Sequence, residues 1–320
     1  MFFKLIQYKL SIRNICISIF LLFSSSLYAD EFISKIPTSL DHSLEKAELG
    51  KKLFLDARLS SDGSVSCASC HSLENYGVDG KNKSIGVAKL LGKRNAPTVY
   101  NAALNFTQFW DGRAANLHEQ APMPLLTDVE MGLSNIDEAI ETLRSIPEYK
   151  AAFTQIYSGD ISLETISDAI AEFGKTLLAP NSPFDKFLDG DKDAISERAK
   201  SGYDKFVAYG CISCHQGANV GGNMFQKFGV HDDISLRGAS DDDLGRYLVT
   251  RNAWDKRVFK VPSLRLAVHT APYFHDGSVE TIEEAIDIMI RFQLGRDVPE
   301  SDRDDIVEFL KTLPGNLQGQ

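Results

Sequence analysis

Apolar residues recur at helical spacing along most of this chain. Periodic segments cover residues 43–54, 136–146, 163–178, 194–209, 279–292 and 302–313. Each pattern predicts an amphipathic α-helix with one buried face. Ser162 and Ser196 stand where N-caps are expected, although Thr165 and Ala199, three residues on, are not the acidic partners of a capping box. No alternating run predicts a strand, so the sequence indicates an all-α fold.

The first thirty residues follow a different pattern. Lys4, Lys9 and Arg13 form a basic start, residues 15–23 are an apolar run, and residues 24–29 are mostly small. This order is typical of a secretory signal peptide, so we expect residues 1–29 to be removed by cleavage after Ala29. The apolar run has about half of the roughly 20 residues that a membrane span needs. We therefore expect a periplasmic protein without a membrane attachment after cleavage.

The length and net charge of the chain limit the classes of function that it can have. The 320 residues include 34 Lys and Arg against 44 Asp and Glu; loss of the three basic signal residues leaves 31 against 44, a net charge of −13. Residues 30–320 suffice for two small domains. The negative surface disfavours nucleic acid and anionic membranes as partners. It is compatible both with a basic redox partner and with an ordinary solvated surface.

Two five-residue strings carry the most specific chemistry. Cys67, Cys70 and His71 form the first string, and Cys211, Cys214 and His215 form the second. Both have the CxxCH pattern of c-type haem attachment, in which the sulfurs add to the haem vinyl groups and the histidine ligates the iron. A disulfide within each pair, or a zinc ion shared by the pairs, needs no histidine there. The fifth cysteine, Cys16, lies in the expected signal peptide, so the sequence predicts two covalently bound haem c groups.

The chain repeats itself beyond these strings. Residues 97–102 lead to Phe109-Trp-Asp-Gly112, and residues 262–267 lead to Phe274-His-Asp-Gly277, an offset of 165, whereas the cysteine strings are offset by 144. The same order with unequal spacing predicts a tandem duplication with an insertion. The proline-rich stretch 179–183 is the predicted boundary. We expect two cytochrome c-like domains, residues 30–182 and 183–320, with the last residues packing back on the first domain.

The two halves differ where a second iron ligand is expected. Met289 follows Gly277 on a predicted helix, and its thioether would complete His/Met ligation, which raises the reduction potential. The matching position in the first half is Pro124, within a predicted loop, residues 121–132, that carries Glu130. A methionine on such a helix is also commonly a core residue, and Glu130 could be a surface acid. The pattern leaves both alternatives open.

With these motifs the chain resembles the bacterial dihaem cytochrome c peroxidases and the related methylamine-utilisation maturation enzymes. The resemblance covers residues 30–320. Its motifs are, in order, Cys67–His71, Asn95–Pro97, Phe109–Arg113, Glu119–Ala121, Val129–Met131, Cys211–His215, Thr270–Gly277 and Gln293–Gly295. It implies a peroxidatic haem in the first half and an electron-storing haem in the second. It also implies hydrogen peroxide as the substrate, a small cytochrome c or cupredoxin as the electron donor, and a homodimer.

The resemblance also implies roles for individual residues. Glu130 looks like the general acid/base that moves a proton during peroxide cleavage, and Gln120 like the group that orients peroxide. Trp110 matches a tryptophan between the two haems, where it would be an electron conduit or a packing residue. Asn95, with the backbone carbonyls of Thr270 and Pro272, corresponds to a calcium site at the domain junction.

One position departs from the family pattern. Many members carry a histidine in a Ser-Ile-Gly-His loop that blocks the resting peroxidatic iron, whereas this chain has Ser84-Ile-Gly-Val87. Valine cannot ligate iron, so we expect a five-coordinate or water-bound first haem that reacts without prior reduction of the second. Lys89, Lys93 and His118 remain as alternative ligands. An ordinary surface position is the other interpretation of each.

Three functions are compatible with these motifs: a peroxide reductase, a dihaem electron carrier, and an oxidase that modifies another protein. A protein that only carries electrons does not need an acidic side chain such as Glu130 next to the iron. In the maturation oxidases a tyrosine replaces the methionine that corresponds to Met289. The sequence therefore favours the peroxide reductase.

Overall fold

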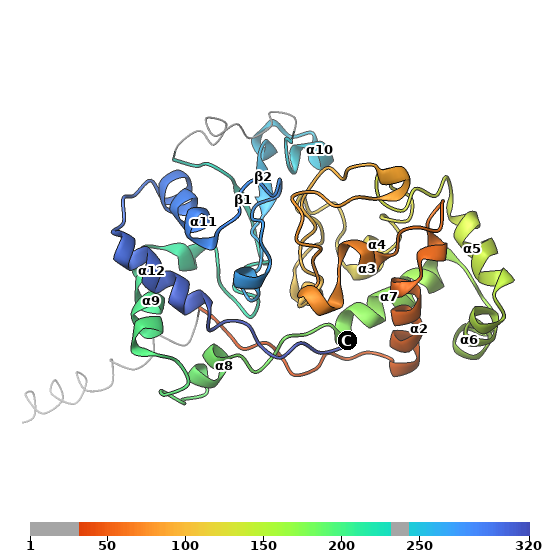
Figure 1. The fold of residues 1–320 in the computed structure, drawn as a ribbon, viewed down its shortest axis with the longest axis horizontal. Coiled ribbons are helices and arrows are strands. Elements are labelled where there is room, and N and C mark those ends of the chain that lie inside the picture. Colours follow the sequence, from red (N-terminus) through yellow and green to blue (C-terminus); the bar gives the residue numbers. More distant parts are fainter. Residues whose placement is uncertain (1–31, 232–242) are drawn as a thin grey trace, which may run out of the picture.

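Two lobes of short helices form the part of the chain that the computed structural model describes, residues 32–231 and 243–320 (Figure 1). The first lobe holds α2 to α7 and the second holds α8 to α12. The expected signal peptide and Cys16 lie outside the described residues. Within those residues, no helix has both the length and the apolar character that a membrane crossing requires.

The structure is mainly helical, as the sequence predicts. The first lobe contains α2 (Leu44–Leu55), α3 (Cys67–Cys70), α4 (Leu117–Gln120), α5 (Ile136–Ser145), α6 (Pro147–Tyr157) and α7 (Leu163–Thr176). The second contains α8 (Pro183–Leu188), α9 (Glu197–Ala208), α10 (Tyr247–Thr250), α11 (Ile282–Ile288) and α12 (Glu300–Leu310). Each of the six predicted helices is present within a few residues of its expected bounds.

The structure departs from the predicted elements in several places, including the short helices α8 and α10, which the sequence did not predict. Helix α6 was not expected; it begins with Pro147 at its first turn, directly after α5, and so needs no loop. Two strands, β1 (Phe225–Lys227) and β2 (Val258–Lys260), pair antiparallel, but each has three residues, too few to show an alternating pattern. The helix predicted to end at Phe292 changes into a π-helical turn at Met289–Gln293.

Ser162 and Ser196 cap α7 and α9 as predicted. The hydroxyl of Ser196 accepts a hydrogen bond from the Ala199 amide at 3.1 Å. At α7, the Ser162 amide donates to the Thr165 hydroxyl at 3.0 Å, and the Ser162 hydroxyl accepts from the Thr165 amide at 3.4 Å. A threonine thus completes the reciprocal cap that an acidic residue usually makes.

In each lobe two helices touch backbone to backbone through a glycine. A Cβ atom on Gly50 of α2 would lie 1.9 Å from the carbonyl oxygen of Ala169 on α7. A Cβ atom on Gly202 of α9 would lie 1.8 Å from the carbonyl oxygen of Asp305 on α12. The missing side chain allows each pair to approach closely. Both lobes therefore have the same helix crossing next to separate apolar cores.

The two ends of the described chain cross between the lobes. Ile33 packs in the core of the second lobe, and the carbonyl of Ser34 accepts a 2.6 Å hydrogen bond from the buried Arg265. At the other end, the Gln318 amide donates to the Leu178 carbonyl at 2.9 Å, and Gln320 donates to Leu73 of the first lobe at 3.3 Å. Ile33, placed by sequence in the first domain, therefore packs with the second lobe, because the chain crosses over before α2 begins.

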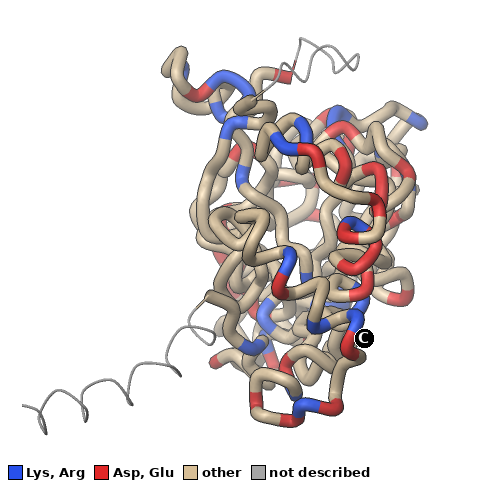
Figure 2. Tube along the Cα trace, turned by 90° about the vertical axis from the view of Figure 1, so that its left-hand side faces the viewer, with Lys and Arg blue, Asp and Glu red and all other residues tan. Residues whose placement is uncertain are grey.

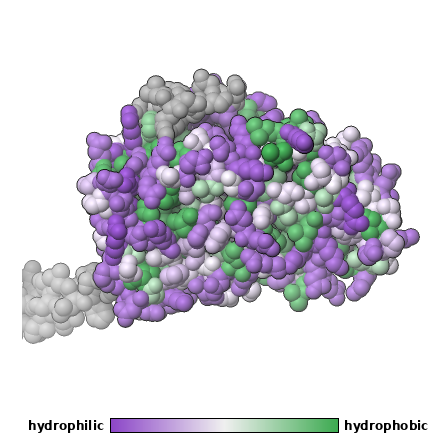
Figure 3. Space-filling view, in the orientation of Figure 1, coloured by the Kyte–Doolittle hydropathy of each residue, from purple (hydrophilic) through white to green (hydrophobic). Residues whose placement is uncertain are grey.

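The surface is mainly hydrophilic. Apolar residues occur in scattered patches on the face that Figure 3 presents. Acidic and basic positions are interspersed along the chain, with acidic ones more numerous along one side (Figure 2). This distribution agrees with the negative net charge of the sequence.

We expect replacement of Gly50 by alanine to destabilise the first lobe. The new Cβ would overlap the Ala169 carbonyl, so α2 and α7 must move apart, at a cost of about 1–3 kcal/mol in the free energy of unfolding. Thermal denaturation followed by circular dichroism measures the change. Lys52→Ala, an exposed substitution in the same helix, is the control and should shift the midpoint little. An unchanged midpoint for Gly50→Ala would contradict the close crossing.

Candidate functional site

The first CxxCH string forms a single helical turn, α3, with His71 at its C-terminal end. The Nδ1 atom of His71 lies 3.2 Å from the carbonyl oxygen of Gly77. Burial lowers the pKa of His71, which favours the neutral imidazole. A carbonyl at Nδ1 fixes the tautomer and leaves Nε2 available to a metal, as in many protein metal sites.

The second string is held in the same way. Cys211–Ser213 form a 3₁₀ turn that follows α9, and Nδ1 of His215 lies 3.3 Å from the carbonyl oxygen of Val220. Burial lowers the pKa of His215 to about 4. The structure forms no disulfide within either string. The described residues also contain no group of three His, Cys, Asp or Glu side chains that could hold one metal ion, so the shared zinc site is not supported.

A large cavity opens beside the second string. Its wall includes Cys211, Cys214 and His215 of the string, and also Met289. Met289 is the first residue of the π-helical turn, and π-turns within helices are frequent at functional sites. Apolar side chains of α11 and α12 complete the wall. Two thiols, an imidazole with a fixed tautomer and a thioether on one cavity are the donor set that a His/Met haem c requires.

First-lobe residues close this cavity at the junction of the lobes. Asn95 and Trp110 line it, together with His275 of the second lobe. The indole Nε1 of Trp110 donates to the carbonyl of Asn95 at 3.0 Å, and the Trp110 and His275 rings make an edge-to-face contact at 6.4 Å. His275 is 7% exposed and stacks on Phe259 at 4.1 Å. The two residues at the equivalent repeat positions therefore meet across the junction.

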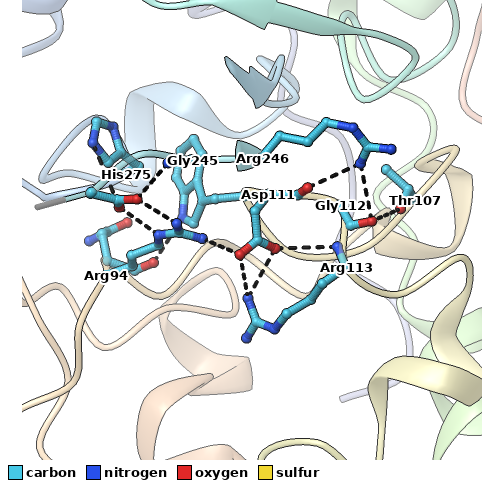
Figure 4. Close-up of polar contacts among 11 residues, drawn as sticks. Arg94, Thr107, Asp111, Gly112, Arg113, Gly245, Arg246 and His275 are labelled. Atoms are coloured by element: carbon cyan, nitrogen blue, oxygen red, sulfur yellow. Dashed lines mark hydrogen bonds and ion pairs between the residues drawn. The ribbon is translucent and has the colours of Figure 1, made fainter. Parts of the chain in front are cut away.

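A network of charged side chains around the buried Asp111 surrounds this contact, and no pattern in the sequence predicted it. Arg94 pairs with Asp111 at 2.7 Å and donates to Asp243 in the second lobe at 2.6 Å through Nε. Arg113 binds the other oxygen of Asp111 at 3.1 Å, and Arg246 donates to the Asp111 carbonyl at 3.2 Å (Figure 4). Opposite charges of both lobes thus neutralise one another at the junction. Only the Asp-Gly repeat motif marked one member, Asp111, as notable.

The loop containing Val87 packs against the segment that carries Glu130. The Val87 amide donates to the Glu130 carbonyl at 2.9 Å, and a Cβ on Gly86 would lie 2.1 Å from the carbonyl oxygen of Val129. The Val87 side chain is 5% exposed and belongs to the first apolar core, which also includes Met131. The position of the family histidine is thus occupied by a core residue.

Glu130 lies beside the first CxxCH string. Burial raises the pKa of Cys67 and of Cys70, and the charge of Glu130 adds a smaller contribution in the same direction at both, so the carboxyl group is within electrostatic reach of their sulfurs. Burial raises the pKa of Glu130 itself, and the positive charge of Arg113 opposes that shift. A buried carboxyl with a raised pKa next to a reactive centre is suited to proton transfer.

The remaining predicted residues lie at more exposed positions. Gln120 ends α4 and is half-buried, and its side chain makes no hydrogen bond within the described residues. Lys89 and Lys93 are exposed. His118 is also exposed and faces a surface pocket with Asp168 of α7. The surface interpretation of these three alternative ligands therefore agrees with their positions.

Asn95, Thr270 and Pro272 line the same cavity, as a shared cation site would require. The side-chain amide nitrogen of Asn95 donates to the Lys81 carbonyl at 2.9 Å. This leaves the amide oxygen of Asn95 without a hydrogen bond from the described residues. Asn95 is only 9% exposed, and an oxygen of this kind is a suitable ligand for a hard cation.

Comparison with known proteins agrees with this geometry. A family profile described as di-haem cytochrome c peroxidase matches residues 44–193. The chain is 45% identical to cytochrome c peroxidase Ccp of Escherichia coli over 90% of its own length, and it spans 62% of the length of that relative. It is 41% identical to cytochrome c551 peroxidase of Nitrosomonas europaea, over 98% of this chain and 93% of that one.

Solved structures share the fold. The crystal structure of a MauG-like protein associated with microbial copper homeostasis superposes with a TM-score of 0.76 at 28% sequence identity. The superposition covers 91% of this chain and 95% of that one. The likeness therefore extends over both lobes.

Proposed function

The chain belongs to the di-haem cytochrome c peroxidase family, and from this premise we propose that it reduces hydrogen peroxide to water with electrons from a small redox protein. When bound, the two haems supply an iron that takes up peroxide in the first lobe and a store, in the second, for one of the two electrons that peroxide consumes. The observation that carries the proposal is the half-buried carboxyl of Glu130, on a segment whose backbone is bonded to the Val87 loop and which lies beside the first CxxCH string.

The role proposed for Glu130 is proton transfer. Peroxide reduction takes one H₂O₂, two protons and two electrons to two waters, and a proton must move from the inner to the leaving oxygen. A carboxyl whose pKa is raised by burial accepts and returns a proton more evenly near neutral pH than an exposed one. Gln120, which has hydrogen-bonding groups free within the described residues, is proposed to orient the peroxide.

The burial of Val87 supports an open first iron. The side chain is fixed in the apolar core, and its amide is bonded to Glu130, so this loop holds the carboxyl segment and offers no ligand. We expect the first haem to have five ligands or a water as the sixth. In the second lobe, His215 and Met289, which line the same cavity, are proposed to ligate the other iron.

The tandem duplication is part of the proposal. It is supported by the two glycine helix crossings and by the repeated motifs, in which Phe109 and Phe274 have φ of 65° and 69° and Gly112 and Gly277 have φ of 69° and 64°. Non-glycine residues adopt this left-handed conformation rarely. On this view one half kept an electron-storing role and the other gained the carboxyl; superposed halves that failed to align Cys67 with Cys211 would argue against it.

The setting of the reaction is proposed from the same premise. The basic and apolar start of the sequence supports export to the periplasm, where covalent haem attachment takes place. The names of the relatives support cytochrome c as the reductant. A small cupredoxin as donor and a homodimer remain predictions of the family resemblance; cell fractionation and analytical ultracentrifugation test the location and the dimer.

Glu130 also separates this proposal from the rival functions. An electron carrier does not need a buried acid beside the reactive string. A protein-modifying oxidase remains a second candidate, because one structural neighbour is described as MauG-like. Met289 on the wall of the second cavity argues against that candidate.

Replacing Glu130 by glutamine is expected to lower kcat/KM for peroxide by about 10²–10⁴, because the proton transfer is lost. The absorption spectra of both haems should stay unchanged. Glu119→Gln is the matched control, since Glu119 is exposed and only caps the Ala115 amide at 2.9 Å. Steady-state peroxide consumption with a reduced cytochrome c measures both variants. Turnover by Glu130→Gln equal to that of the parent protein would exclude the proposed role.

The oxidised protein is expected to show one high-spin and one low-spin haem. The first haem should be high-spin because Val87 offers no ligand. The second haem should be low-spin because His215 and Met289 fill both remaining positions of its iron. EPR and absorption spectroscopy of the air-oxidised protein test this. Peroxide consumption should be the same with and without prior one-electron reduction. Two low-spin signals, or activity only after reduction, would show that another group blocks the first iron.

Calcium is proposed to bind the Asn95 amide oxygen with the carbonyls of Thr270 and Pro272, because these oxygens share one cavity wall. After removal of bound metal with a chelator, titration calorimetry should detect calcium binding. Asn95→Ala should weaken it, while Asn82→Ala, at an exposed position of the preceding loop, should not. The absence of binding heat for the parent protein would remove this site from the proposal.

A further inference from the structure

Lys260 is a buried cation that lacks a counter-charge within the described residues. It lies at the end of β2, is 8% exposed, and its amide donates to the Trp110 carbonyl at 2.7 Å. No carboxylate in the described residues lies within ion-pair distance of its ammonium group. An unpaired buried ammonium is costly, so its presence calls for a specific partner.

The other buried cation of the described residues shows the usual arrangement. Arg265 is 0% exposed and pairs with Asp185 at 2.8 Å, while its remaining N–H groups donate to Ser34, Ser182 and Ala218. Its charge is therefore fully compensated within the chain. The charge of Lys260 is not.

Asp111 is the nearest acidic group that acts on Lys260, but its oxygens are already engaged. Arg94 binds Oδ2 of Asp111 at 2.7 Å, and Arg113 binds Oδ1 at 3.1 Å. Two arginines thus share this single carboxylate, so it has no free charge left for a third cation. No other carboxylate of the described residues pairs with Lys260, so its charge is left for a partner that binds in the cavity.

The cavity of the second CxxCH string supplies the place for such a partner. Lys260 lines it together with Cys214 and His215, and so faces the group that those residues attach. A haem has an apolar ring and two propionate side chains, which are its only negatively charged groups. A lysine on an otherwise largely apolar wall matches that charge.

From this juxtaposition we propose that the ammonium group of Lys260 forms an ion pair with a propionate of the second haem. The pair anchors the propionate edge next to Trp110, whose carbonyl already holds the Lys260 backbone. It places a positive charge beside this haem, which stabilises the reduced form over the oxidised form. The inference depends on haem occupancy of the second lobe and not on peroxide turnover.

The test is the midpoint potential of the second haem, measured by optical redox titration of the holoprotein. Lys260→Met keeps the length of the side chain and removes the charge, so the potential of the second haem should fall. Lys260→Arg should restore most of it. The potential of the first haem serves as an internal reference and should stay unchanged. Peroxide turnover is not the readout, so failure of the proposed function would leave this result interpretable.

Lys227→Met is the matched control. Lys227 lines the same cavity but is exposed, so solvent and salt screen its charge and its removal should shift the potential less. A second-haem potential in Lys260→Met equal to that of the parent, or a shift no larger than in Lys227→Met, would overturn the proposal.

A second measurement does not depend on a folded variant. In a crystal structure of the parent holoprotein, Nζ of Lys260 should lie within hydrogen-bond distance of a propionate oxygen of the second haem. Propionates bound only by other groups would overturn the proposal even if Lys260→Met fails to incorporate haem.

Discussion

The backbone contact of paired helices is the constraint on which both lobes depend. At Gly50 and at Gly202 the absence of a side chain lets one helix rest on a carbonyl of its partner. Close approach here fixes the direction in which the chain leaves α2 and α9 toward the cysteine strings. Much of the chain around both cysteine strings consists of short helical turns and loops. The two helix crossings therefore provide the rigid part of an otherwise loop-rich protein.

Equivalent backbones carry different chemistry in the two lobes. In both, a histidine Nδ1 meets a backbone carbonyl at just over 3 Å, so the proximal side is the same. The distal sides differ, because a π-turn with Met289 borders one cavity, whereas proline-rich chain with Glu130 lies beside the other string. On the proposed function, one short segment in each lobe accounts for the difference in chemistry between the two lobes.

Local patterns predicted the elements of this fold well, and tertiary contacts explain the rest. The cap at Ser162 and the periodicity of α7 are properties of neighbouring residues, so the sequence was sufficient. Strand β2 has three residues and exists because β1 lies beside it. Lys260 has no ion pair within the described residues. The carboxylate of Asp111 already binds Arg94 and Arg113, which are both far from Lys260 in the sequence. The spacing of residues in a sequence does not show which cations will compete for one carboxylate. The charged network at the junction of the lobes was therefore not predicted.

The exchange of terminal segments has a consequence for biogenesis. In export that starts at the N-terminus, residues 32–36 cross the membrane first. The surface around Arg265 that binds them has not yet formed at that point. Residues 32–36 can therefore dock only after the second lobe has crossed. Residues 318–320 can dock only when export is complete. Docking of the two terminal segments is therefore a late step in folding. Because residue 34 is bonded to the second lobe and residue 320 to the first, cleavage of the linker between α7 and α8 would leave both of these contacts between the lobes in place.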